Sequence, residues 1–552
     1  MERLFAQHAC REKIELSPMW LLKTEDAGGL EKPEKALVPS VWESHPRLRN
    51  YRGRAAYTQT FTGGGNLLFR FGGVSFRAKV FLDDVLLGEH MDAFTGFSVL
   101  AKGIEEGTHT VRVAVDNRFG PDAALHVPND YYSYGGINRP VTVERVPDIF
   151  LTALYAVPEC KDGTWQVHVT VTGRNVSGED GTCTVRLFLG DAHWEEDVRF
   201  PAGEEHSVRF TLSCPEVQVW SPETPVLYTI RACLAKDGEV TDDLIERFGF
   251  REVRILGNRI LLNGQPLFLR GFNRHEELGA FGVSVPVEGM MRDLQLMREL
   301  GANCVRTCHY PNDPRFLDLC DELGMLVWEE SHARGMNEEK MRNPAFMPQL
   351  RTSTREMVVQ HINHPSIFIW GCLNECADDT VYGEACYREI LDLLRSLDPS
   401  RPVTAALLRR PGSRIFDAPD VVSINTYPQW YHNASVREDI DDKLVEIRKK
   451  GGMGKPIIIS EIGGGAIYGF HDPLGEAKWS EERQATILRT QLEAILSHEA
   501  LSGVFLWQFA DVRVDESWAM SRPRTMNNKG IVDEYRRPKA AYSVVRELFH
   551  SL

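Results

Sequence analysis

The second half of the chain alternates short apolar runs with helix-patterned segments, and this alternation restricts the fold more than any other feature. Two of the helical patterns end on Gly301 and Gly324, and an apolar run of strand length follows each glycine at once. Eight such runs separated by helices are typical of a (β/α)8 barrel. A doubly wound parallel sheet fits less well, because no glycine-rich phosphate loop follows the first run. The expected barrel strands are residues 266–270, 303–307, 325–329, 367–371, 403–407, 421–425, 456–460 and 503–509.

The first half of the chain has a different pattern. From residue 57 to residue 146, strand-length runs of alternating polar and apolar residues are separated by turn residues such as Asp83 and Asp84. Residues 148–251 repeat the pattern over a length typical of a β-sandwich. We therefore predict three domains: two all-β domains over residues 1–146 and 147–253, then the barrel over residues 254–552.

Composition and charge argue against several classes of protein. The 552 residues carry 63 Lys and Arg against 78 Asp and Glu, a net charge of −15, which disfavours nucleic acid and anionic membranes as partners. No apolar stretch has the length of a signal peptide or a membrane span, so we expect a cytoplasmic protein. The eleven cysteines are an odd number without a CxxC pair, which favours reduced thiols over disulfides or zinc ligands. We expect no metal and no other cofactor.

Polar and aromatic residues follow seven of the eight expected strands. In a (β/α)8 barrel the active site lies at the C-terminal ends of the strands, so these residues are the candidate site. They are Arg274, His275 and Glu276; His309 and Tyr310; Glu329, Glu330, Ser331 and His332; Asn374 and Glu375; Asn425 and Tyr427; Glu461; and Trp507 and Asp511.

Two of these carboxylates, Glu375 and Glu461, each come directly after an apolar strand. Cleavage of a glycosidic bond needs such a pair, because one carboxyl must deliver a proton to the leaving oxygen while the other acts on the anomeric carbon. The amide of Asn374 could bind a sugar hydroxyl beside the reacting carbon. Glycines 463–465, which follow Glu461, leave room for a substrate.

The sequences around these glutamates resemble glycoside hydrolase family 2, and within it the bacterial β-glucuronidases. The segment IFIWGCLNE, which ends in Asn374 and Glu375, is similar to the family's acid/base motif. The segment PIIISEIGGG, which contains Glu461, resembles its nucleophile motif. The resemblance implies a retaining, exo-acting glycosidase with Glu375 as acid/base and Glu461 as nucleophile. It also implies a jelly-roll-like domain and an immunoglobulin-like domain before the catalytic (β/α)8 TIM barrel, and a homo-oligomer.

Further segments extend the resemblance to the sugar-binding residues. Residues 425–431 look like the family's active-site tyrosine segment, and LWQFAD resembles the end of its last strand. The segment VPNDYYSYGGINRP is similar to the family's loop from the first domain into the active site. The resemblance therefore implies substrate contacts for Asp130, Tyr427, Tyr431 and Trp507, and we add His275 from its position after the first strand.

A four-residue segment, Asn527-Asn528-Lys529-Gly530, resembles the Asn-x-Lys-Gly signature that separates glucuronidases from their galactosidase relatives. A buried uronate carboxylate needs a cation and a hydrogen-bond donor to replace its hydration. The ammonium of Lys529 and the amide of Asn527 could supply both. We therefore predict that the substrate is a β-D-glucuronide.

Arg334 departs from the family pattern, where a small or apolar residue is usual. Its guanidinium could bind a hydroxyl of altered orientation, so a β-D-galacturonidase or a dual hexuronidase stays open as an alternative. A β-galactosidase and a noncatalytic carbohydrate-binding protein are less favoured. Loss of either glutamate would have supported the noncatalytic alternative, and the chain has both Glu375 and Glu461.

Overall fold

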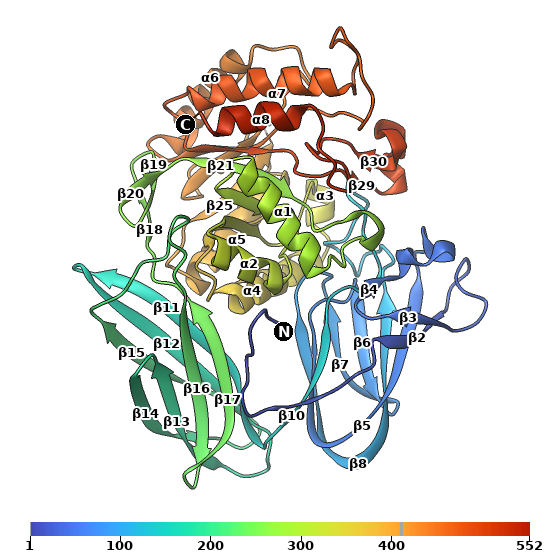
Figure 1. Ribbon diagram of the computed structural model, residues 1–552, viewed down its shortest axis with the longest axis vertical. Helices are drawn as coiled ribbons and strands as arrows, with labels where there is room; N and C mark the ends of the chain where they lie inside the picture. The colour runs from blue at the N-terminus through green and yellow to red at the C-terminus, as the bar shows by residue number, and fades with distance from the viewer. Residues whose placement is uncertain (1, 409–411, 552) are drawn as a thin grey trace.

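The computed structural model describes residues 2–408 and 412–551. Two β-rich parts, blue and teal to green in Figure 1, lie side by side against a barrel that forms the rest of the molecule. This arrangement confirms the predicted fold class, in which two sandwich-like β parts precede a (β/α)8 barrel. The exact domain boundaries stay a prediction.

The first β part is built around two long antiparallel strands, β5 (Arg54–Phe71) and β8 (Phe97–Asp116). The first half of β5 pairs with β2 and its second half pairs with β10, so this one strand runs through both halves of the sheet. The other strands are β1 (Glu12–Ile14), β2 (Met19–Thr24), β3 (Glu34–Leu37), β6 (Arg77–Leu82), β7 (Val85–Met91) and β10 (Val141–Val146), with the short pair β4 (Ser40–Val41) and β9 (Gly136–Ile137).

The second β part is a sandwich of a three-stranded and a four-stranded antiparallel sheet. Alternate residues along the strands, such as Val167, Val169 and Val171, point into the shared core and are buried. The strands are β11 (Ile149–Lys161), β12 (Thr164–Asn175) and β15 (Glu205–Cys214) in one sheet, and β14 (Ala192–Phe200), β13 (Gly181–Leu189), β16 (Tyr228–Lys236) and β17 (Glu239–Phe248) in the other.

A small antiparallel sheet then leads into the barrel and corrects one predicted strand. Its strands are β18 (Val253–Leu256), β19 (Arg259–Leu262) and β20 (Gln265–Leu267). The run at residues 266–270 was predicted as the first barrel strand, but its first half belongs to β20. The barrel strand β21 is Leu269–Arg274, displaced toward the polar residues. The apolar run extends over both β20 and β21, and only Phe268 lies between them. The turns at Gly257 and Gly264, where φ is positive, separate β18, β19 and β20 from one another.

The barrel closes with eight parallel strands, and the glycine after α2 shows how the helices end. Gly324 adopts φ +71 and ends α2, while Asp313 caps its start by accepting a hydrogen bond from the Arg315 backbone. The strands are β21, β22 (Cys304–Thr307), β23 (Leu326–Glu330), β24 (Ile367–Gly371), β25 (Val403–Leu408), β26 (Val421–Asn425), β27 (Ile457–Ile462) and β28 (Gly503–Leu506). The α-helices are α1 (Val287–Glu299), α2 (Pro314–Leu323), α3 (Glu338–Met341), α4 (Phe346–His361), α5 (Val381–Leu397), α6 (Val436–Ile447), α7 (Glu481–Leu496) and α8 (Ala541–Phe549).

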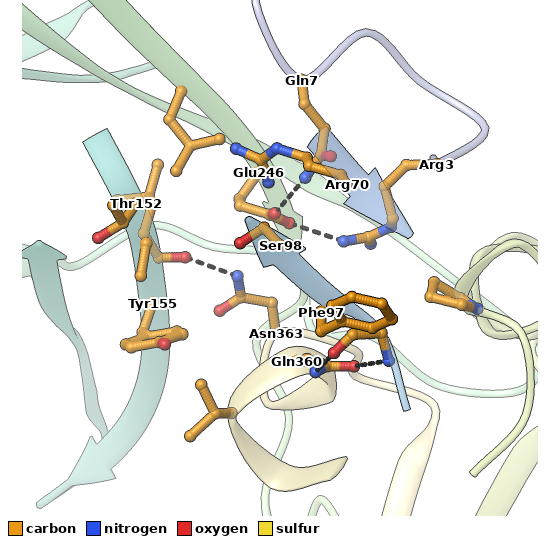
Figure 2. Close-up of a pocket in the computed structure, with 16 residues that line it drawn as sticks. Arg3, Gln7, Arg70, Phe97, Ser98, Thr152, Tyr155, Glu246, Gln360 and Asn363 are labelled. Carbon is orange, nitrogen blue, oxygen red and sulfur yellow. Dashed lines mark hydrogen bonds and ion pairs between the residues drawn. The ribbon is translucent and has the colours of Figure 1, made fainter. Parts of the chain in front are cut away.

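The N-terminal segment ties the three parts together. A cavity of about 280 Å³ lies at their junction. There Arg3 and Gln7 both donate hydrogen bonds to Glu246 of β17 (Figure 2). Arg3 also forms an ion pair with Asp318 of α2, at 2.7 Å. Across the described residues, no helix combines the length and the apolar character needed to span a bilayer.

Candidate active site

The two predicted carboxylates lie at the C-terminal mouth of the barrel. Glu461 is the second-last residue of β27, and Glu375 follows the end of β24 by four residues. Glu461 is 3% exposed, and the Glu375 side chain is 14% exposed, so both face the interior of the mouth. The barrel mouth therefore holds both groups largely away from bulk water.

Both oxygens of Glu461 accept hydrogen bonds. Tyr427 donates its hydroxyl to Oε2 at 2.7 Å, and Arg306 donates Nη1 to Oε1 at 2.9 Å. These two donors stabilise the ionised form of the carboxyl. Burial, and next the negative charge of Glu375, outweigh them and raise the pKa of Glu461 to about 7. The negative charge of Glu375 therefore acts on the Glu461 carboxyl.

Arg306 organises the floor of the site. It extends from β22 into the barrel, is fully buried, and donates two hydrogen bonds to Glu330, at 3.0 and 2.8 Å. It also donates to Asn273 and Asn374, both at 2.8 Å. Arg306 therefore fixes Glu461 and Asn374 relative to each other. This residue was missed from the sequence, because the strand at 303–307 contains other polar residues and nothing there distinguishes an inward-facing arginine.

The Asn374–Glu375 turn has an unusual backbone. Glu375 adopts φ +52, a left-handed conformation that is costly for a residue with a side chain. Its backbone N–H donates to the Ala406 carbonyl at 2.9 Å, and its Oε1 accepts from Asn425 at 2.9 Å. The Nδ2 group of Asn374 is buried and makes no hydrogen bond to the protein, so it is a donor available to a substrate hydroxyl.

Three aromatic side chains form one wall of the mouth. The rings of Trp507 and His309 stack at 5.1 Å, and His275 meets Trp507 edge-on at 5.5 Å. The Nε2 atoms of both histidines are buried without a protein partner. Burial lowers the pKa of each imidazole well below its ordinary value, so both are neutral near pH 7. Neutral imidazoles can bind sugar hydroxyls without adding charge.

The first β part contributes Asp130 to this mouth. Asp130 is 3% exposed and forms ion pairs with Arg334 at 3.1 Å and with Arg522 at 3.2 Å. Burial disfavours its charged form, but Arg334, Lys529 and Arg522 together hold the pKa of Asp130 below its ordinary value. Arg334 also lies 3.7 Å from Glu375, so it bridges Asp130 and that carboxyl. The side chain of Arg334 is only 13% exposed, so Arg334 is not a surface arginine.

The Asn527–Gly530 segment lies against the same group. Lys529 is 2% exposed, and burial lowers the pKa of its ammonium, while Tyr431 counteracts this shift. Asn527 uses its Nδ2 group on Asp130, at 3.3 Å from Oδ2, and its Oδ1 is buried without a partner. The donor of Asn527 that we assigned to a uronate is therefore engaged by Asp130. Tyr431 is 57% exposed and lies at the rim, with its ring 5.3 Å from the Lys529 ammonium.

Asp511 supports this segment from below. It accepts the backbone N–H of Gly530 at 2.9 Å and pairs with Lys539 at 2.7 Å, and neither side chain is exposed. Asp511, one of the predicted strand-end residues, thus positions the segment and does not face the mouth.

Of the other predicted strand-end residues, Arg274 pairs with Asp293 of α1 and Glu329 contacts His361 of α4, so these two are directed at the surrounding helices. Arg522 was also missed from the sequence, because it lies in a loop with no motif or hydrophobic periodicity that would indicate a buried arginine.

The arrangement has two chemical halves. One half holds a pair of interacting carboxyls, Glu375 and Glu461, of the kind that glycosidic cleavage requires. The other half gathers three cations, Arg334, Arg522 and Lys529, around the single carboxylate of Asp130. A small molecule that spans both halves would present a glycosidic bond at one end and a negative charge at the other.

Comparisons with known proteins agree with this geometry. The model of the TIM barrel domain of glycosyl hydrolases family 2 matches residues 253–552, and a second model of glycosyl hydrolases family 2 matches residues 149–251. The chain is 28% identical to a putative β-glucuronidase of Formosa agariphila over 519 residues, which are 86% of this chain and 61% of that protein's length. It is 28% identical to a β-glucuronidase of Streptococcus agalactiae over 526 residues, 87% of this chain and 84% of that protein.

Solved structures give a similar result. A family 2 β-galacturonidase from Eisenbergiella tayi, bound to galacturonate, superposes with a TM-score of 0.98 and 47% identity, covering 100% of this chain and 99% of that one. A β-glucuronidase from Ruminococcus gnavus superposes with a TM-score of 0.86 at 24% identity, covering 100% and 99%, a likeness that shows the fold alone. Because the barrel model alone matches more than half of the chain, this protein belongs to glycosyl hydrolase family 2 and is a glycoside hydrolase.

Proposed function

We propose that this protein is a retaining, exo-acting β-D-hexuronidase, which releases a terminal β-linked uronic acid from a glycoside. The observation that carries the proposal is the excess of buried cations beside the carboxyl pair. Arg334, Arg522 and Lys529 are opposed by Asp130, and Arg334 also lies 3.7 Å from Glu375. In the proposed reaction Glu375 enters as the proton donor and carries no charge, so a ligand carboxylate is needed to balance the cations. A neutral galactoside would leave that charge uncompensated.

The reaction proceeds in two displacements. Glu461 attacks the anomeric carbon while Glu375 donates a proton to the departing oxygen; Glu375 then deprotonates the water that cleaves the glycosyl–enzyme bond. The assignment of the two roles rests on resemblance to family motifs. Hydrogen bonds from Tyr427 and Arg306 support Glu461 as the nucleophile, because they stabilise the ionised form that attacks and so oppose burial and the charge of Glu375, which raise its pKa to about 7. The free Nδ2 of Asn374 suits the hydroxyl beside the anomeric carbon.

β-Glucuronides are the first candidate substrates, since the curated relatives that match most of this chain bear that name. β-Galacturonides are the second, and two specific observations favour them. The structure with 47% identity is a β-galacturonidase, and Arg334 projects a buried guanidinium between Asp130 and Glu375. The two sugars differ only in the orientation of the C4 hydroxyl, a difference that a fixed guanidinium fork can distinguish.

Turnover of p-nitrophenyl β-D-glucuronide, β-D-galacturonide and β-D-galactoside, measured side by side, tests the proposal. We expect kcat/KM for at least one uronide to exceed that for the galactoside by about 100-fold or more, because a missing buried charge partner costs several kcal/mol. Proton NMR of the first product should show the β-anomer. A preference for the neutral galactoside would refute the uronidase proposal, and an α-anomer would refute retention.

Two further features of the proposal concern the cell and the assembly. The eleven cysteines are all free in the described chain, which supports a reducing compartment and hence the cytoplasm. The homo-oligomer rests on family resemblance, and light scattering coupled to size exclusion would measure it.

A further inference from the structure

A buried cluster of three side chains lies behind the active-site wall and has no part in the proposed reaction. Asp92 follows β7, His126 lies in the segment that leads to Asp130, and His332 follows β23. Asp92, His126 and His332 are 1%, 2% and 1% exposed. The cluster therefore joins the first β part to the barrel at a place that water reaches poorly.

Each of the three side chains has a buried polar atom without a protein partner, although Oδ1 of Asp92 accepts the backbone N–H of Phe94 at 2.9 Å. Oδ2 of Asp92, Nε2 of His126 and Nδ1 of His332 make no hydrogen bond to the protein. The ligand atoms of the three residues lie within 4.8 Å of one another. Three buried polar atoms left unsatisfied in one place indicate a missing binding partner, because each costs free energy when alone.

A second buried group in the described chain shows the contrast. The ligand atoms of Asp318, Asp321 and His364 also lie within 4.8 Å of one another. There Arg3 pairs with Asp318, and Asp321 accepts hydrogen bonds from the Ser366 backbone and contacts the His364 ring. The protein itself satisfies those carboxylates. It does not satisfy Oδ2 of Asp92.

We propose that Asp92, His126 and His332 form a binding site for a divalent transition-metal ion, with Zn²⁺ the best match to two imidazoles and one carboxylate. The separation between Nε2 of His126 and Oδ1 of Asp92 is 4.0 Å. Ligands around Zn²⁺ lie about 3.4 Å apart in a tetrahedral site, and opposite ligands lie about 4.2 Å apart in an octahedral one. Small side-chain rotations thus bring the three atoms to bonding distance.

The second nitrogen of His332 fits this assignment. Nε2 of His332 lies 3.2 Å from the hydroxyl of Tyr131. If Nε2 carries the proton and donates it to that oxygen, Nδ1 presents its lone pair to the metal, as is usual for metal-binding histidines.

The metal would stabilise the two backbone segments that carry Asp130 and Arg334. His126 precedes Asp130 by four residues, and His332 precedes Arg334 by two. Asp130 and Arg334 form the 3.1 Å ion pair at the mouth of the barrel. A metal held by His126 and His332 would therefore fix the two backbone segments that carry this pair.

Metal titration of the whole protein tests the site. The protein is stripped with a chelator, desalted and titrated with Zn²⁺, and in a parallel sample with Co²⁺. We expect one tightly held equivalent of metal by mass spectrometry after a second desalting step, visible absorption from bound Co²⁺, and a higher melting temperature with metal. Asp92→Asn and His126→Gln should each weaken binding by at least about 100-fold, since even the loss of an outer hydrogen-bond partner costs 10- to 100-fold.

The matched control is His364→Gln, which alters the comparison cluster. It should leave the stoichiometry and the Co²⁺ spectrum unchanged, and circular dichroism should show that all three variants are folded. Stripped wild-type protein that takes up no stoichiometric metal would overturn the proposal and leave an ordered water as the occupant. Equal binding by the wild type and both ligand variants would overturn it as well.

Discussion

At the scale of single residues, burying the Glu461 carboxyl lowers the stability of the folded protein at neutral and higher pH. The pKa of Glu461 in the folded protein, about 7, exceeds its ordinary value of 4.5, so folding favours the protonated carboxyl. The contribution of this group to the free energy of unfolding is therefore greatest below pH 4.5 and falls as the pH rises to about 7. The loss is about 3 kcal/mol for an isolated shift of this size.

Glu461→Gln should remove this pH dependence. The variant is expected to gain melting temperature relative to the wild type at pH 8, where Glu461 is ionised, and to gain little at pH 5. Scanning calorimetry at both pH values measures the difference. Glu31→Gln, at an exposed position, is the control, and its effect on the melting temperature should be the same at pH 5 and pH 8. An equal effect of Glu461→Gln at pH 5 and pH 8 would contradict the electrostatic explanation.

Lys529 is expected to determine whether a charged or a neutral sugar is cleaved. Lys529→Ala removes a buried ammonium, so the uronate carboxylate loses a counter-charge, at a cost of about 2–5 kcal/mol. Steady-state kinetics should show kcat/KM for the uronide falling about 30-fold to several-thousand-fold, with slow galactoside turnover unchanged or improved. If Lys529→Ala cleaves uronides as well as the wild type does, the uronate site lies elsewhere.

Arg334 carries the prediction on C4 stereochemistry. Its guanidinium is held by Asn129 at 2.7 Å and Asp130 at 3.1 Å, so it cannot follow a hydroxyl of the opposite orientation. We expect Arg334→Ala to lower kcat/KM for galacturonide about tenfold or more relative to glucuronide, the size of one charged hydrogen bond. Arg342→Ala, which alters an exposed arginine of the same loop region, is the control. A galacturonide-to-glucuronide ratio that stays fixed would assign Arg334 to structure alone.

At the scale of elements, the Asn527–Gly530 segment depends on a buried ion pair beneath it. Lys539 donates to Asp511 and to the Ala466 carbonyl, both at 2.7 Å. Lys539→Met leaves Asp511 buried without its partner, which should lower the free energy of unfolding by about 3–5 kcal/mol. Chemical denaturation measures this. The double variant with Asp511→Asn should recover much of the loss, and failure to recover it would argue that the ion pair is not the cause.

The same scale shows what the sequence could predict. The strand at 367–371 coincides with β24 because an apolar run ends there at a glycine. The predicted bounds of the first barrel strand were too early in the chain, because β21 contains Asn273 and Arg274. These two residues are polar, yet they are buried by partners that only the closed barrel supplies. Polar residues inside a barrel have no periodic signature. Arg306 was missed for the same reason, whereas the glutamates were found because each follows an apolar strand.

At the scale of the whole molecule, the site is complete only when the first β part is docked on the barrel. Asp130 comes from one part, and Glu375, Arg334 and Lys529 come from the other. A buried ion pair joins the two parts nearby: Arg139 donates to Glu276 at 2.7 Å, and their side chains are 2% and 1% exposed. Arg139 also donates to the carbonyls of Phe94 and Pro311, at 2.6 and 2.8 Å.

Arg139→Met should therefore weaken the contact between the first β part and the barrel more than it destabilises either of these two parts. The change leaves Glu276 buried without its cation, at a cost of about 3–5 kcal/mol that falls on the contact between the parts. Because Asp130 depends on that contact, we expect activity to be lost on heating several degrees before the circular dichroism signal of the barrel, whereas the two losses coincide in the wild type. Adding Glu276→Gln removes the unpaired charge and should bring the two temperatures together again. If activity and secondary structure are lost together in Arg139→Met, the junction does not open as a unit, and the first β part and the barrel unfold as one cooperative body.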